Sequence, residues 1–133
     1  MIKDPKIVYG GGAAEISCSL YVSEKADSIS TIEQYAIRAF AEALDSIPLS
    51  LAENSGYNGI EYLANLKSKQ IKEKNPCLGV DCLKKGTYNM MRQEVYDGYN
   101  SKKMQFQLAT QVCKMILKID EIIKPHNINE TSF

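Results

Sequence analysis

The sequence predicts a mainly helical domain that carries a small β-hairpin. Apolar residues recur at spacings of three and four over several segments, which is typical of amphipathic helices. A short apolar stretch between Pro76 and Gly86 departs from this pattern and indicates the hairpin. The 133 residues are 44% hydrophobic and 24% charged, as in ordinary globular domains. We therefore expect one domain over residues 1–125 and a disordered tail over residues 126–133.

The first helix is expected directly after a glycine turn. Gly10–Gly12 precedes Ala13, Ile16 and Leu20, whose spacing is helical. Glycine reaches backbone conformations that other residues avoid, so three in a row favour a tight turn. We interpret the segment as a turn that opens a helix over about residues 13–23.

The second helix is predicted to begin at a capping box. Ser30 is the expected N-cap and Glu33 follows three residues later, ahead of apolar residues that continue to Ile47. Pro48 should break or kink this helix because proline lacks a backbone N–H. A short helical continuation is then expected to end at Asn54–Gly56.

The third helix is predicted from Gly59 to Lys74, with its lysines and glutamates on a solvated face. Cys77–Leu83 then forms the first half of the expected hairpin, and Lys85–Gly86 turns the chain back through Thr87 and Tyr88. A short helix should follow over residues 90–95.

The last long helix is predicted from about Ser101 to Leu117, after an interruption at Gly98. Leu108, Val112, Met115 and Ile116 form its apolar stripe. The segment 119–123 either continues this helix or forms a C-terminal edge strand.

Composition argues against several classes of function. The chain has 16 Lys+Arg and 16 Asp+Glu, so no net charge attracts it to nucleic acid or to a membrane surface. Its longest apolar runs are far shorter than the roughly 18 residues of a membrane span. Without a recognisable signal peptide, we expect a reducing, cytoplasmic location.

The cysteines do not form a recognisable metal motif. Cys18, Cys77, Cys82 and Cys113 are scattered, and the single histidine, His126, lies in the polar tail. Cys77 and Cys82 have no second close pair to complete a zinc site. We expect no metal site within this chain.

The first candidate binding feature is the turn Gly10, Gly11 and Gly12. Consecutive glycines before a helix let a ligand approach backbone N–H groups, and the helix dipole favours an anion there. The same pattern also serves tight packing between chain segments. The turn by itself leaves both interpretations open.

Asp81 and Asp97 are the other candidates from local pattern. Asp81 lies beside Gly79 in the apolar hairpin, where a carboxylate either caps a turn or accepts hydrogen bonds from a ligand. Asp97 precedes Gly98 and a helix start, where it would accept hydrogen bonds from free N–H groups with or without a ligand hydroxyl. No Ser/His/Asp or Cys/His arrangement is present, so we do not expect a self-contained enzyme.

Six segments form an ordered set that covers nearly everything before the tail: 7–17, 33–44, 49–56, 75–82, 108–111 and 115–123. Taken in this order, they resemble the group II chaperonins, and in particular their eukaryotic cytosolic branch, TRiC/CCT.

The resemblance implies the C-terminal part of a helical equatorial domain, which binds ATP and makes ring contacts in the family. It places Gly10–Gly12 against the nucleotide and Asp81 near the adenine and ribose. Asp97 falls where the family usually has a ribose-contacting glutamate, and Lys102 falls at a lysine near the nucleotide. Aspartate is one methylene shorter, so the resemblance implies a weaker or water-bridged contact at Asp97.

Other parts of the family's ATPase site are absent from these residues. The Gly-Asp-Gly-Thr phosphate loop, with its Mg²⁺-binding aspartate, does not occur in the chain. Because phosphoryl transfer depends on metal and positioning groups, we expect no ATP hydrolysis by this chain alone. The resemblance implies a fragment of a longer subunit, whose client proteins bind to domains outside it.

The resemblance also implies partners. Neighbouring subunits of a hetero-oligomeric double ring would share the edge strand expected at 119–123, and the isolated chain should self-associate through exposed apolar stripes. The alternative is a free-standing helical interaction module without nucleotide binding.

Overall fold

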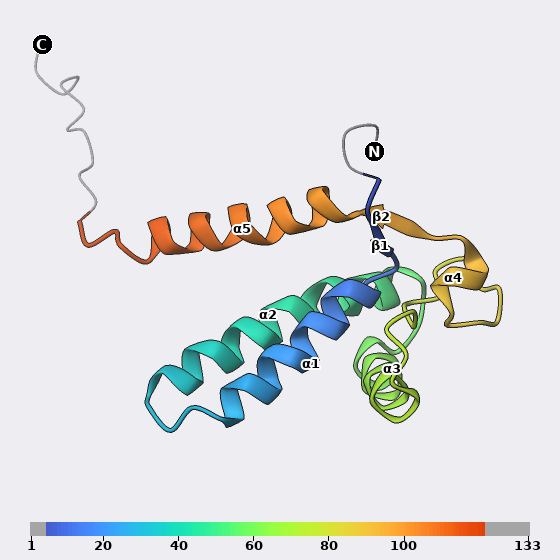
Figure 1. Ribbon diagram of the computed structural model, residues 1–133, viewed down its shortest axis with the longest axis horizontal. Coiled ribbons are helices and arrows are strands. Elements are labelled where there is room, and N and C mark those ends of the chain that lie inside the picture. Colours follow the sequence, from blue (N-terminus) through green and yellow to red (C-terminus); the bar gives the residue numbers. More distant parts are fainter. Residues whose placement is uncertain (1–4, 122–133) are drawn as a thin grey trace, which may run out of the picture. The chain divides into compact units, whose positions relative to one another are not determined.

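The computed structural model describes residues 5–121 and confirms the mainly helical class (Figure 1). Its elements are β1 (Ile7–Tyr9), α1 (Ala13–Asp27), α2 (Glu33–Asn54), α3 (Gly59–Glu73), α4 (Met90–Gln93), β2 (Tyr96–Gly98) and α5 (Tyr99–Ile116). The chain divides into two compact units, residues 1–99 and 100–133, and each is described by itself. The expected tail lies outside the described residues.

The first two helices, α1 and α2, pack side by side as an antiparallel pair (Figure 1). Small residues line their contact: Ser19 and Ala26 on α1, and Ala41 and Ala52 on α2, are buried. Small side chains let the two helix backbones approach closely. A hydrogen bond of 3.1 Å from the Gln34 side chain to the carbonyl of Ala26 joins their connected ends.

A single apolar core lies where α1, α2 and α3 meet the loop after α3. Ile16, Leu66 and Val80 belong to it, and each is at most 2% exposed. Ala52 and Leu78 complete the buried cluster. Residues from four separate segments therefore remove their apolar surface from water together, which is the main favourable contribution to folding.

Two polar side chains of α3, the buried Gln70 and the partly buried Lys67, connect these segments. Gln70 donates to the carbonyl of Leu78 at 2.7 Å and accepts from Ser17 at 3.1 Å. Lys67 forms an ion pair with Asp45 of α2 and donates to Ser19 of α1 at 3.2 Å. Because buried polar groups are costly unless paired, these contacts fix the register of the three helices.

The sheet joins the two ends of the first unit. β1 and β2 are antiparallel, with Ile7 opposite Gly98, Val8 opposite Asp97 and Tyr9 opposite Tyr96. The sequence analysis did not predict this pairing, because three-residue strands give no usable alternation and their partners are about ninety residues apart.

The start and the middle of α2 differ from expectation. Its N-cap is Ile32, without a side-chain capping bond, so the capping box expected at Ser30 is wrong. Thr31 donates to the Glu33 carboxylate instead, at 3.4 Å. Pro48 does not end the helix, which continues to Asn54. The proline is buried, and packing can offset the hydrogen bond that it removes.

The expected hairpin at 77–88 is reduced to one isolated antiparallel bridge, between Leu78 and Asn89. The chain turns back as predicted, but the ladder does not extend because Asp81 organises the turn through its side chain. The C-terminal strand is absent over residues 119–121. Residues 122 and 123 lie outside the described part.

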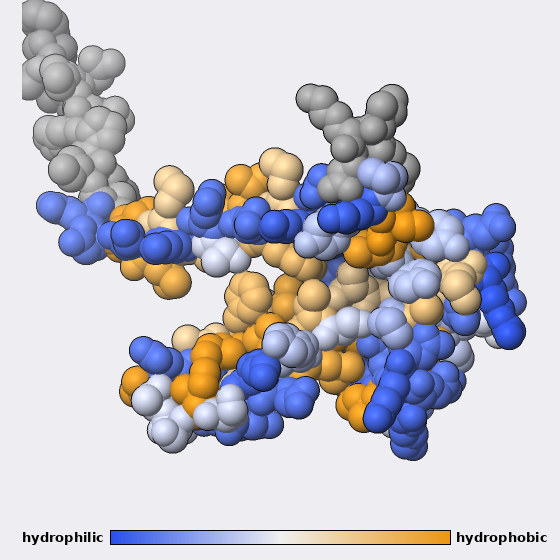
Figure 2. Space-filling view, viewed as in Figure 1, coloured by the Kyte–Doolittle hydropathy of each residue, from blue (hydrophilic) through white to orange (hydrophobic). Residues whose placement is uncertain are grey.

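The second unit contains α5, which begins two residues earlier than predicted and ends at Ile116. Its apolar stripe includes Leu108, Val112 and Met115, and none of its residues is buried. Figure 2 shows apolar side chains at the surface of both units. Within the described chain, no helix combines the length and the apolar character that a membrane crossing requires.

We expect Leu66→Ala to destabilise the protein by about 2–5 kcal/mol, because it opens a cavity in the core shared by the three helices. Urea unfolding followed by circular dichroism at 222 nm measures the change. Leu83→Ala is the matched control, since Leu83 is 63% exposed. Equal losses of unfolding free energy in the two variants would contradict this description of the core.

Candidate functional site

The glycine turn and the loop after α3 meet in one close backbone contact, which we call the glycine junction (Gly10–Gly12 with Gly79–Asp81). The Val80 N–H donates to the carbonyl of Gly11 at 2.7 Å. A Cβ on Gly79 would lie 2.9 Å from the carbonyl oxygens of both Gly10 and Gly11. Two segments far apart in sequence are therefore held against each other by their main chains.

The packing around the turn requires glycine. Gly11 and Gly12 have φ angles of +62° and +76°, in the left-handed region that side chains disfavour. A Cβ on Gly11 would also lie 2.6 Å from the sulfur of Met90, and one on Gly12 would lie 2.8 Å from the Cβ of Pro48. The packing interpretation of the turn is thus supported, and it leaves a ligand role for the same backbone open.

Asp81 is buried at the edge of the junction, and its carboxylate organises the following loop. One oxygen accepts from the Lys85 N–H at 3.1 Å and from the Gln93 side chain at 2.8 Å. The other accepts from the Gly86 N–H at 2.7 Å. These bonds are the turn-capping role that the sequence analysis left open beside a ligand role.

Burial alone would raise the pKa of Asp81, because it disfavours the charged form. Hydrogen bonds from the Lys85 backbone, the Gln93 side chain and the backbone of Gly86 and Thr87 together outweigh this effect. The net result is a pKa below the usual value, so Asp81 is ionised near neutral pH.

Two tyrosines, Tyr57 and Tyr62, lie beside Asp81 and line a cavity with it. Tyr57 and Tyr62 stack with ring centroids 4.4 Å apart, and the hydroxyl of Tyr62 accepts from the Asp81 N–H at 3.1 Å. Burial raises the pKa of Tyr62 to about 12. A cavity of about 230 Å³ opens here, lined by Tyr57, Tyr62, Asp81, Lys84, Gly86 and Tyr88.

Asp97 lies next to the glycine turn through the β1–β2 sheet. It pairs with Val8, and its Oδ2 is 3.6 Å from the position that a Cβ on Gly10 would occupy. The Gly10 N–H donates to the carbonyl of Val95 at 3.0 Å. Asp97 is therefore part of a strand, two residues before α5 begins.

The structure brings together most of the predicted site. Gly10–Gly12, Asp81 and Asp97 surround one junction in the first unit, whereas Lys102 lies in α5, in the second unit. Gln93, Tyr62 and Tyr57, whose side chains hydrogen-bond to Asp81, were not predicted from the sequence. No local pattern distinguishes these residues, although Gln70 could have been noticed as a polar residue on an apolar stripe with Leu63 and Leu66.

Metal-binding chemistry is not evident in the described part of the chain. Within residues 5–121, no group of three or more His, Cys, Asp or Glu side chains is arranged to hold a metal ion. The free cysteines range from the buried Cys77 to the exposed Cys82 and Cys113.

Comparison with known proteins gives one consistent family. The model of the TCP-1/cpn60 chaperonin family matches residues 1–127. T-complex protein 1 subunit epsilon of Encephalitozoon cuniculi (strain GB-M1) is 46% identical over 123 residues, which are 92% of this chain and 23% of that protein. A thermosome subunit of Methanothermococcus thermolithotrophicus is 38% identical over 128 residues, 96% of this chain and 24% of the relative.

Solved structures give the same result. The open-state monomer of a group II chaperonin from Methanococcoides burtonii matches with a TM-score of 0.80 and 35% identity, over 86% of this chain and 28% of that one. A group III chaperonin in the open state matches with a TM-score of 0.83 and 32% identity, over 88% of this chain and 24% of that one. The resemblance found in the sequence is confirmed.

Gly79→Ala is expected to be strongly destabilising, because its methyl group would lie 2.8 Å from Met90 Cγ as well as against two backbone oxygens. Gly86→Ala is the control: no atom lies within 4 Å of the added Cβ, and only its φ of +75° opposes the change. We expect about 1 kcal/mol of destabilisation at Gly86 and clearly more at Gly79. Chemical unfolding measures both, and the reverse order would contradict the described junction.

The stability contributed by ionised Asp81 should depend on pH. Because its pKa is lower in the folded state, this contribution is fully present above the unfolded value, near 4, and is lost as the pH falls through the folded value. Asp81→Asn should be less stable than the original protein at pH 7, with a gap that narrows below about pH 4. Urea unfolding from pH 7 to pH 3 measures the gap. A constant gap over this range would exclude the carboxylate's charge as the cause.

Proposed function

Because the chain belongs to the TCP-1/cpn60 chaperonin family, we propose that it forms the C-terminal part of the ATP-binding equatorial domain of a chaperonin subunit. The chain spans 23% of the length of one of the two curated relatives and 24% of the other. We therefore also propose, rather than observe, that it works as part of a whole chaperonin subunit. The proposed assembly is a hetero-oligomeric ring in the cytosol, built with other chaperonin subunits.

The observation that carries the proposal is the convergence of three segments at the glycine junction. Gly10–Gly12 presents main chain without side chains, and the carboxylate of Asp97 lies beside Gly10. A carboxylate accepts hydrogen bonds, so Asp97 fits a ribose hydroxyl. The Asp81 loop borders the cavity lined by tyrosines. We infer that these groups bind the adenine and ribose side of ATP or ADP.

ATP with Mg²⁺ would supply the phosphoryl group that a chaperonin hydrolyses, and the chain's own residues have a limited part in this. Asp97 would orient the ribose, and the turn would set how closely the base approaches. The Gly-Asp-Gly-Thr loop that the resemblance assigns to Mg²⁺ is not among these 133 residues. Hydrolysis and the folding of client proteins therefore depend on other parts of the proposed subunit.

Exposed apolar side chains support contacts with further chain segments or subunits. Tyr35, Phe40 and Ile47 on α2 are all exposed, although apolar side chains of this size are usually buried. In the proposed assembly these residues are covered, and in the isolated chain they would promote self-association. The alternative, an interaction module without nucleotide binding, would use the same surface.

Nucleotide binding is tested by titrating the ¹⁵N-labelled chain with ADP at millimolar concentration. We expect shifts of the amide signals of Gly10–Gly12 and Asp81. Asp97→Ala should weaken the apparent affinity about tenfold, since a hydrogen bond to a charged group is lost. Asp27→Ala is the control, because Asp27 is an exposed acid that pairs only with Arg38 at the surface. Absence of any shift at the junction would favour the interaction module.

A further inference from the structure

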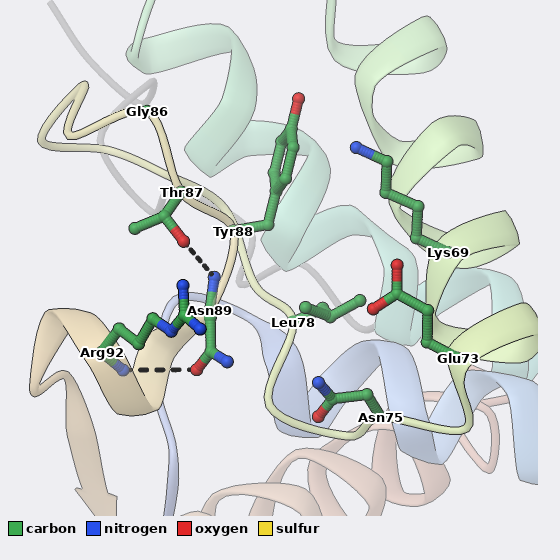
Figure 3. A pocket seen from close by; sticks show the side chains of 9 residues that line it. All are labelled: Lys69, Glu73, Asn75, Leu78, Gly86, Thr87, Tyr88, Asn89 and Arg92. Atoms are coloured by element: carbon green, nitrogen blue, oxygen red, sulfur yellow. Dashed lines mark hydrogen bonds between the residues drawn. The ribbon is translucent and has the colours of Figure 1, made fainter.

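A second cavity lies on the other side of Tyr88, between α3 and the segment that leads into α4 (Figure 3). Its volume is about 380 Å³. Lys69 and Glu73 face it from α3, and Arg92 faces it from α4. Gly10–Gly12, Asp81 and Asp97 do not line it, although it shares Gly86 and Tyr88 with the smaller cavity beside Asp81.

Three uncharged polar side chains of this cavity already accept hydrogen bonds from the nearby main chain. The Asn75 carbonyl oxygen accepts from the Cys77 N–H at 3.0 Å, and the Thr87 hydroxyl accepts from the Asn89 N–H at 3.3 Å. The Asn89 carbonyl oxygen accepts from the N–H groups of Met91 and Arg92. These bonds hold the three side chains in place, and each side chain also carries hydrogen-bond donors: two amide NH₂ groups and one hydroxyl proton in all.

The charged groups add two strong donors. The Lys69 ammonium lies 3.8 Å from the centroid of the Tyr88 ring, which holds it at the cavity wall by a cation–π contact. Among the residues that the structure describes, neither this ammonium nor the Arg92 guanidinium forms an ion pair. Glu73 is the one acidic residue in the lining, so the cavity has a net positive charge.

We propose that this cavity binds an oxyanion, the carboxylate or phosphate group of a ligand. A guanidinium presents paired donors that match the geometry of carboxylate and phosphate oxygens, and the ammonium adds a point charge. The amide and hydroxyl donors of Asn89 and Thr87 complete the set. A cavity of about 380 Å³ exceeds a bare ion, so it also accommodates part of the molecule that carries the oxyanion. The negative charge of Glu73 repels an oxyanion and weakens its binding. The site therefore favours ligands whose oxygens accept hydrogen bonds from several of the donors at once.

The test is an NMR titration of the 133-residue chain with two probes, inorganic phosphate and a tetraglutamate peptide. We expect saturable shifts of the amide signals of Thr87, Asn89 and Arg92. Arg92→Gln should weaken binding about tenfold, because a charged donor pair is lost while the folded state loses no side-chain bond. Glu73→Gln should strengthen binding, and added salt should weaken it. Lys72→Gln is the matched control, the same charge change on α3 outside the lining.

The two probes separate the possible sources of the oxyanion. Binding of tetraglutamate without binding of phosphate identifies an acidic protein segment as the ligand, and tighter binding of phosphate than of tetraglutamate identifies a phosphate-bearing one. Either result supports the proposal. It is overturned if neither probe shifts these signals, or if Arg92→Gln and Lys72→Gln lower the affinity equally. The signals differ from those of the glycine junction, so the site and the proposed nucleotide contacts can fail independently.

Discussion

The hydrogen bond from the Val80 N–H to the carbonyl of Gly11 is the contact on which the first unit depends. It joins main chains that are about seventy residues apart, and at 2.7 Å it leaves no space for side chains between them. Glycine at positions 11 and 79 is therefore a steric requirement. The contact fixes where α1 begins and where the loop after α3 runs, and thereby positions Val80 in the core and Asp81 at its edge.

Buried polar groups then stabilise what this contact arranges. Gln70 binds the carbonyl of Leu78, which keeps the irregular loop against α3 without a strand ladder. Asp81 does the same for the turn that follows, through bonds to Lys85, Gly86 and Gln93. Each of these groups would be costly if its partner were removed, because burial deprives it of water. Irregular segments of the fold are thus held in place by hydrogen bonds from buried side chains.

The packing role and the proposed nucleotide role of the junction are compatible. Glycines that permit a close approach of two backbones also add no side chains of their own to the turn. The β1–β2 sheet brings Asp97 to the same turn, since Tyr9 and Tyr96 pair at its end. In the proposed equatorial domain, the contacts of the glycine junction would both stabilise the fold and shape the nucleotide site. The oxyanion cavity, by contrast, depends on the N–H and O–H donors of Asn75, Thr87 and Asn89. The oxygens of these side chains accept hydrogen bonds from the nearby main chain.

The sequence by itself determined the helical class, the approximate ranges of α1, α3 and α5, the family, and the glycines and aspartates that gather at the junction. Helical periodicity and a specific order of motifs depend on residues close together in the chain, so they can be recognised without the fold. Tertiary structure alone decided the continuation of α2 through Pro48, the pairing of β1 with β2, and the partners of Asp81. These features depend on contacts between segments tens of residues apart, where packing and buried hydrogen bonds outweigh local preference.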